Sequence, residues 1–220
     1  DCWPMYFNRV VGWLRKYHVK TAIFTSSQTA EKMREVLPDM DVLSITEGID
    51  VKPYREGNLL VKRNIDLLEY GSMERNFFRE LVTGINHVNR GNAHGCMDSF
   101  EQLVDTIGKS KVTIALPRCD TAPEMTGGIE TLTQRFWECM LSRTVLLGRA
   151  PKELVDLIGY NPVVDLDRNN PEFQVREIVN HISDYQELVD KNRETALRMA
   201  PWELRMKDVM EWLVGLGYCI

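Results

Sequence analysis

The sequence predicts an α/β fold organised around a Rossmann-like, doubly wound parallel sheet. Short runs of apolar and β-branched residues, such as KVTIALP at 111–117 and TVLLG at 144–148, alternate with amphipathic runs of helical length. Such uninterrupted apolar strands are typical of parallel sheets that helices cover on both faces. Ligands of these sheets bind where the strands end, so we expect function in the loops at the carboxyl edge.

Residues 1–50 predict a partial N-terminal α/β segment. A helix is followed by a strand within 20–27, a second helix that ends before Pro38, and a strand at 41–45. The stretch 46–58 is polar and contains Gly and Pro, which indicates a linker to the next part of the chain.

Residues 51–200 predict the main domain, and residues 201–220 predict a C-terminal helix. In that helix an apolar stripe recurs at helical spacing, and we expect it in the core. The stripe consists of Met206, Val209, Met210 and Leu213. The main domain is expected to contain, in order, a strand ending at Gly71, a helix at 75–88, a loop at 89–98, a helix at 99–108, strands at 111–117 and 144–148, a helix at 151–159, a strand at 161–167 and mostly helix from Pro171.

Composition excludes several classes of protein. The formal net charge of −5 argues against a nucleic-acid-binding protein, which needs an excess of Lys and Arg. The five cysteines have no paired spacing, so we expect reduced thiols and a cytoplasmic protein. No apolar run approaches the length that spans a bilayer. The first helix is basic, and it either packs on its own sheet or makes peripheral contact with the inner membrane face.

The stretch GGIETLTQRFWE at 127–138 carries the chemistry. Gly127 and Gly128 tolerate unusual backbone angles and let a ligand approach the main chain. Thr131 and Gln134 fit a capping box, so the sequence predicts a helix that begins near residues 130–131. The N-terminus of such a helix has free N–H groups and a positive partial charge, and it is a natural site for phosphate.

Glu130 and Glu138 are eight positions apart in this stretch. On one helix they would be separated by roughly 12 Å along the axis and turned by roughly 80° about it, so they would not form a close pair. They would instead touch different parts of one long ligand. With a diphosphate at the start of the helix, Glu138 would accept hydrogen bonds from a ribose diol, and Glu130 would lie near the group beyond the phosphates.

The segment from Gly127 to Gly159 resembles the donor-binding motif of the group 1 glycosyltransferases. These are retaining, nucleotide-sugar-dependent enzymes of the GT-B fold, and their signature is two glutamates with seven residues between them. Glu130 and Glu138 match that signature. The resemblance implies the C-terminal, donor-binding half of a GT-B fold with only part of the N-terminal half, and a last helix that crosses back toward that part. The rest of the N-terminal domain would come from a longer chain or from a partner, or the protein would not transfer sugar alone.

By this resemblance Glu138 would bind the donor ribose, and Glu130 would contact the transferred sugar and stabilise charge at its anomeric carbon. The backbone amides of Thr131 and Leu132 would hold the diphosphate leaving group.

The family also places an arginine just after the first strand of this domain, where it neutralises phosphate. Here that strand ends at Gly71, Ser72 stands where the arginine is common, and Arg75 is the nearest substitute.

The implied activity is transfer of a sugar from a nucleotide-diphosphate sugar to a glycan or lipid-linked acceptor, with retention, in polysaccharide biosynthesis. Two alternatives stay open: a non-catalytic nucleotide-sugar-binding module completed by another chain, and a nucleotide-sugar epimerase. No metal or other cofactor is expected. Asp165 and Asp167 resemble a metal-binding D-x-D, but aspartates at strand ends are usually turn formers. His94, Cys96 and Asp98 are too few and too closely spaced for a zinc site.

Overall fold

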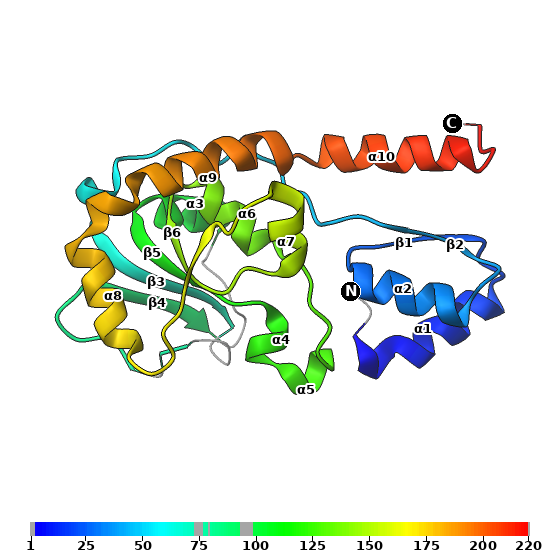
Figure 1. Cartoon of the computed structure of the whole chain (residues 1–220), viewed down its shortest axis with the longest axis horizontal. Coiled ribbons are helices and arrows are strands. Elements are labelled where there is room, and N and C mark those ends of the chain that lie inside the picture. Colours follow the sequence, from blue (N-terminus) through cyan, green and yellow to red (C-terminus); the bar gives the residue numbers. More distant parts are fainter. Residues whose placement is uncertain (1–2, 73–76, 79, 93–98, 220) are drawn as a thin grey trace.

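The computed structural model describes residues 3–72, 77–78, 80–92 and 99–219. These residues form an α/β architecture with two parallel sheets, one of two strands and one of five (Figure 1). The five-stranded sheet has the order β4-β3-β5-β6-β7, and every neighbouring pair is parallel. The predicted fold class is therefore confirmed. In the described part of the chain, no helix combines the length and the apolar character needed to cross a membrane.

The N-terminal part is a small layer of helices on the two-stranded sheet. Its elements are α1 (Pro4–Lys16), β1 (Thr21–Phe24), α2 (Ser27–Val36) and β2 (Asp41–Ser44). The hydroxyl of Ser26 caps α2 by accepting a hydrogen bond from the N–H of Thr29. Val11, Leu14 and Met33 lie in its separate hydrophobic core.

The five-stranded sheet forms the larger part, and its strands β5 and β6 are buried on both faces. β6 is buried along its whole length, which explains why its sequence shows no alternation of apolar and polar residues. Helices α3, α6, α7 and α9 contribute to the hydrophobic cluster on one face, and helix α8 contributes to the cluster on the other together with Val189 of α9. The elements are β3 (Ile65–Ser72), β4 (His87–Asn92), α3 (Phe100–Gly108), β5 (Ser110–Ala115), α4 (Arg118–Thr121), α5 (Pro123–Thr126), α6 (Gln134–Leu141), β6 (Val145–Gly148), α7 (Lys152–Ile158), β7 (Val163–Asp165), α8 (Pro171–Asn180) and α9 (Gln186–Met199), with short 3-10 turns at Leu60–Lys62 and Ile182–Tyr185.

The helix predicted over residues 75–88 is wrong for the residues that the structure describes there. The carboxylate of Glu69 accepts hydrogen bonds from the N–H groups of Phe77 and Phe78, at 2.6 and 3.3 Å. The ring of His87 accepts the N–H of Val82 at 3.0 Å. These side chains take the backbone donors that a helix would need.

The predicted loop at 89–98 also begins too early in the sequence. β4 runs from His87 to Asn92 and pairs in parallel with β3. The polar sequence of β4 concealed it, because a strand that pairs along one edge needs no run of apolar residues.

The C-terminal helix α10 (Trp202–Gly215) runs back from the larger part toward the N-terminal part (Figure 1). Ile49 and Pro201 form an isolated parallel bridge where the chain leaves and re-enters this region. The predicted apolar core stripe is mostly exposed: Val209 is buried, whereas Met206 and Met210 are 50% and 39% exposed. The predicted domain boundaries near residues 50 and 200 stay predictions.

Candidate functional site

The carboxyl ends of β3, β5 and β6 lie side by side at one edge of the sheet. Gly71 lies at the end of β3 with φ +107°, a conformation that favours glycine. Arg118 follows β5 in the chain, and Arg149 follows β6. This edge is where a ligand of a parallel sheet is expected, and both predicted glutamates belong to segments that reach it.

Helix α6 begins at Gln134, three to four residues later than the sequence predicts. The capping box is not formed, because Thr133 and not Thr131 is the N-cap residue and no side chain caps the helix. Glu130 therefore lies in the loop before the helix, and the helical separation expected for Glu130 and Glu138 does not apply.

Contacts with distant parts of the chain keep this loop extended. The amide of Glu130 donates to the side chain of Gln28, and the amide of Leu132 donates to Glu153, both at 3.0 Å. Glu153 also accepts the N–H and the hydroxyl of Ser27, at 2.8 and 2.6 Å. The predicted phosphate-binding amide of Leu132 is thus engaged by a carboxylate here, and Thr131 is buried.

Glu138 lies on α6 with its carboxylate between two phenols. The hydroxyl of Tyr70 donates to it at 2.7 Å, and that of Tyr54 lies at 3.5 Å. Burial raises the pKa of Glu138, and the hydrogen bond from Tyr70 and the charge of Arg135 partly offset that rise. Burial likewise raises the pKa of Tyr70. The carboxylate is therefore fixed in direction by neutral donors and keeps further lone pairs for a ligand.

Glu130 belongs to a second charged cluster, built from the segments that follow β5 and β6. One carboxylate oxygen lies 2.5 Å from a guanidinium nitrogen of Arg149, and the other accepts the N–H of Lys152. Arg149 also binds Asp120 through two hydrogen bonds, at 2.7 and 2.8 Å. The hydrogen bonds from Arg149 lower the pKa of Asp120.

Of the other predicted residues, Gly127 has a structural role. Gly127 ends α5 with φ +55°, and a Cβ there would lie 2.7 Å from the ring of Pro4. Gly128 has φ +80° and open space around it. Arg75 lies outside the described residues.

Glu130 and Glu138 share no hydrogen-bonding partner among the described residues. The structure connects Glu138 to β3 and the linker, and it connects Glu130 to the loop after β6.

Sequence reasoning missed the residues that hold the two glutamates. Tyr70 lies close to the end of β3 and Arg149 directly follows β6, and these positions are a signal that could have found them. Tyr54 lies in the linker, and Asp120 lies in a short helix, where no sequence pattern marks them.

No group of three side chains suited to a metal occurs in the described residues. Asp165 and Asp167 are exposed, and the carboxylate of Asp167 accepts the N–H of Asn169, which is a turn-forming contact. His94, Cys96 and Asp98 lie outside the described residues.

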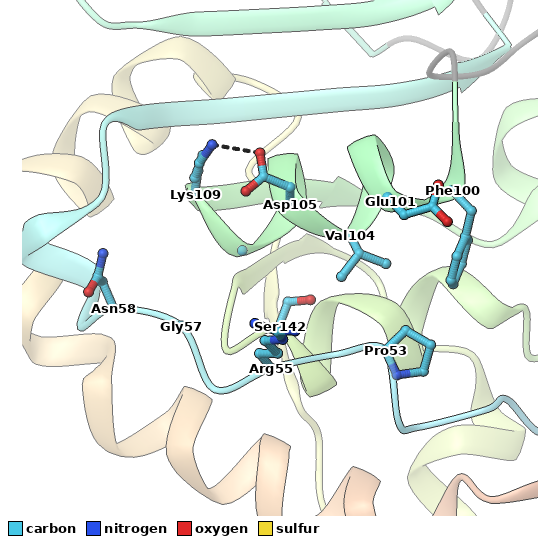
Figure 2. A pocket seen from close by; sticks show the side chains of 11 residues that line it. Pro53, Arg55, Gly57, Asn58, Phe100, Glu101, Val104, Asp105, Lys109 and Ser142 are labelled. Atoms are coloured by element: carbon cyan, nitrogen blue, oxygen red, sulfur yellow. Dashed lines mark hydrogen bonds and ion pairs between the residues drawn. The ribbon is translucent and has the colours of Figure 1, made fainter.

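A cavity of about 610 Å³ lies beside α3, between that helix and residues 53–58 (Figure 2). Phe100 and Val104 line it from α3, and Ser142 lines it at the end of α6. The cavity is lined by neither glutamate, and it extends to Lys109 at the amino edge of the sheet.

No family profile and no curated protein sequence matches this chain. Among solved structures, it is similar to a sucrose-phosphate synthase from Thermosynechococcus elongatus, with a TM-score of 0.57 and 16% identity over 89% of this chain and 59% of that one. It is also similar to AviGT4, a glycosyltransferase of avilamycin A biosynthesis. The TM-score is 0.53 and the sequence identity is 16%, and the match covers 92% of this chain and 68% of AviGT4. A glycosyltransferase from Rickettsia africae ESF-5 has a TM-score of 0.53 and a sequence identity of 12%, and the match covers 93% of this chain and 66% of that one.

The chain has the fold of these glycosyltransferases. Its five-stranded parallel sheet, flanked by helices, matches their GT-B type of architecture. At this level of identity the likeness concerns the fold alone. The chain spans 59% of the length of the sucrose-phosphate synthase.

Proposed function

We propose that this chain is the donor-binding part of a retaining glycosyltransferase. It would transfer a sugar from a nucleotide-diphosphate sugar to a glycan or lipid-linked acceptor. The observation that carries this proposal is the carboxylate of Glu138, oriented by the Tyr70 phenol at 2.7 Å beside the carboxyl end of β3. A carboxylate held in this way is well suited to accept both hydroxyl groups of a ribose.

In the proposed reaction Glu130 contacts the transferred sugar. The ion pair with Arg149 and the hydrogen bond from the Lys152 N–H would fix the direction of its carboxylate. Negative charge at this position would favour the positive charge that develops at the anomeric carbon. The proposal includes no metal, so we expect transfer to continue in the presence of a chelator.

Nucleotide binding tests the proposal directly. Titration calorimetry with UDP, ADP, GDP and TDP should detect binding of at least one of them to the full chain. Glu138→Ala should weaken that binding by about 1.5–3 kcal/mol, the range for hydrogen bonds to charged groups. Glu172→Ala is a suitable control, because Glu172 is an exposed partner of Arg176 on α8. Unchanged affinity in Glu138→Ala would contradict the assigned role of Glu138.

A second candidate is a nucleotide-sugar-binding module without transfer activity. Both carboxylate oxygens of Glu130 already have partners within the chain, and this observation favours it. Product analysis after incubation with nucleotide sugars separates the candidates: transfer or hydrolysis supports the first, an altered sugar on the nucleotide supports an epimerase, and binding without a product supports the module. If transfer is found, Glu130→Gln should abolish it and spare nucleotide binding.

A further inference from the structure

Arg135, in the first turn of α6, extends its guanidinium group over the carboxyl end of β3. One of its nitrogens donates to the backbone carbonyl of Tyr70 at 2.5 Å. The guanidinium carbon lies 4.5 Å from the centre of the Tyr70 ring, which is a cation–π contact. A Cβ on Gly71 would lie 2.5 Å from the same guanidinium, so the absence of a side chain at position 71 leaves room for Arg135.

No carboxylate of the described residues neutralises the charge of Arg135 through an ion pair. By contrast, Arg149 and Arg168, which follow β6 and β7, both pair with Asp120. The guanidinium of Arg135 thus has donors available for an anionic ligand at this edge.

Arg118 is the other arginine at this edge that makes no ion pair among the described residues. Its guanidinium lies against the ring of Trp3 at 5.3 Å and contacts the sulfur of Met125. Those contacts turn it toward α5 and the N-terminal end of the chain. Arg118 therefore lacks the connection to the Glu138 site that Arg135 has.

Tyr70 joins Arg135 to Glu138. Its carbonyl and ring hold the guanidinium, and its hydroxyl donates to the carboxylate at 2.7 Å. A cation and an anion are thus placed next to each other without forming a direct ion pair. A ligand that carries hydroxyl donors beside phosphate acceptors has the complementary order of groups, and a nucleoside diphosphate is such a ligand.

We propose that Arg135 binds the phosphate groups of a nucleoside diphosphate whose ribose lies on Glu138. The inference rests on the proposed function and assigns the positive charge that the sequence alone places at Arg75. The planar fork of a guanidinium can donate two parallel hydrogen bonds to phosphate oxygens. Arg135 would therefore distinguish a diphosphate from the nucleoside that lacks it.

The test compares diphosphates with nucleosides on the full chain. For whichever of UDP, ADP, GDP or TDP binds the wild type, Arg135→Gln should weaken the diphosphate by about 10- to 150-fold. Affinity for the matching nucleoside, measured by displacement of the diphosphate from the wild type and by direct titration of the variant, should change by less than about threefold. Arg118→Gln removes one positive charge from the same edge and should weaken the diphosphate by less than about threefold, because a long-range charge effect is screened by salt.

Each outcome separates this inference from the proposed function. If the wild type binds none of the diphosphates, the proposed function fails and the role of Arg135 fails with it. If the wild type binds one and Arg135→Gln binds it equally well, or if Arg118→Gln weakens it as much, only the role of Arg135 is overturned. Should Arg135→Gln fail to fold, Arg135→Lys keeps the charge but loses the fork, and it should lose at least about fivefold in diphosphate affinity. Wild-type affinity in that variant would also overturn the inference.

Discussion

Burial beside Tyr70 raises the pKa of Glu138 above its ordinary value of 4.5. The folded protein therefore binds the Glu138 proton more tightly than the unfolded chain does. It follows that the contribution of this group to stability is greatest at acid pH and falls as the pH rises from 4.5 through the folded-state pKa. A carboxylate kept in a position that lowers stability at neutral pH is a common property of ligand-binding sites.

Glu138→Gln should separate stability from binding. The amide is neutral, so the free energy of unfolding at about pH 8 should equal that of the wild type or exceed it by up to about 2 kcal/mol. The difference should disappear at about pH 4, where the wild-type carboxyl group is protonated. Denaturant unfolding at both pH values measures this effect. A variant that is clearly less stable than the wild type at the higher pH would show that Glu138 has a structural role instead.

Gly148, the last residue of β6, lies very close to the backbone of β5. A Cβ there would lie 1.9 Å from the carbonyl oxygen of Ala115 on β5, so Gly148→Ala must push these strands apart. We expect a loss of about 3 kcal/mol. Gly12 in α1 has open space around it, and Gly12→Ala should instead gain about 0.5–1 kcal/mol from helix propensity. Similar unfolding midpoints for the two variants would contradict the close approach of β5 and β6.

At the level of elements, Glu153 joins segments that are far apart in the sequence. Its carboxylate lies in the first turn of α7 and accepts donors from Ser27, at the start of α2, and from Leu132, before α6. The loop that carries Glu130 is thus held to the N-terminal part of the chain. This arrangement explains why α6 begins later than its sequence predicts.

Glu153→Ala should release that loop. Three donors lose their acceptor, so we expect the free energy of unfolding to fall by about 1–3 kcal/mol. The amide of Leu132 should also exchange its hydrogen faster, as measured by native-state hydrogen exchange. Glu172→Ala removes only an exposed ion pair with Arg176 and should cost less than about 0.5 kcal/mol. Unchanged exchange at Leu132 would show that Glu153 does not hold the loop.

Much of the fold could be predicted from the sequence, because buried parallel strands such as β5 and β6 are continuous apolar runs. The position of Glu138 on a helix could be predicted as well, whereas its contact with Tyr70 on β3 could not. The start of α6 could not be predicted, since Glu153 is 21 residues from Leu132 and 126 from Ser27, and no local pattern encodes such contacts. β4 was missed for a similar reason: its neighbour in the sheet specifies it, and its own composition does not.

For the whole molecule, several groups of contacts hold the N-terminal part against the larger part, and the packing of α1 on α5 is one of them. Trp3 lies against Arg118, the start of α2 binds Glu153, and the linker contacts the C-terminal segment, where the amide of Ile49 donates to the carbonyl of Ala200. The apolar stripe on α10 was wrongly expected in the core. Periodicity shows which residues share a helix face, but it does not show whether another surface lies opposite that face.

Arg205 on α10 is suited to test whether the C-terminal helix holds the linker. It is 4% exposed, its guanidinium donates to the carbonyl of Met199, and it lies 3.0 Å from the hydroxyl of Thr46 in the linker. Arg205→Ala leaves these acceptors without a partner, so we expect a loss of about 2 kcal/mol and faster hydrogen exchange at the amide of Ile49. Lys207→Ala, on the exposed side of α10, removes an equal charge and should change stability by less than about 0.5 kcal/mol. Equal effects of the two substitutions on Ile49 exchange would mean that α10 does not hold the linker.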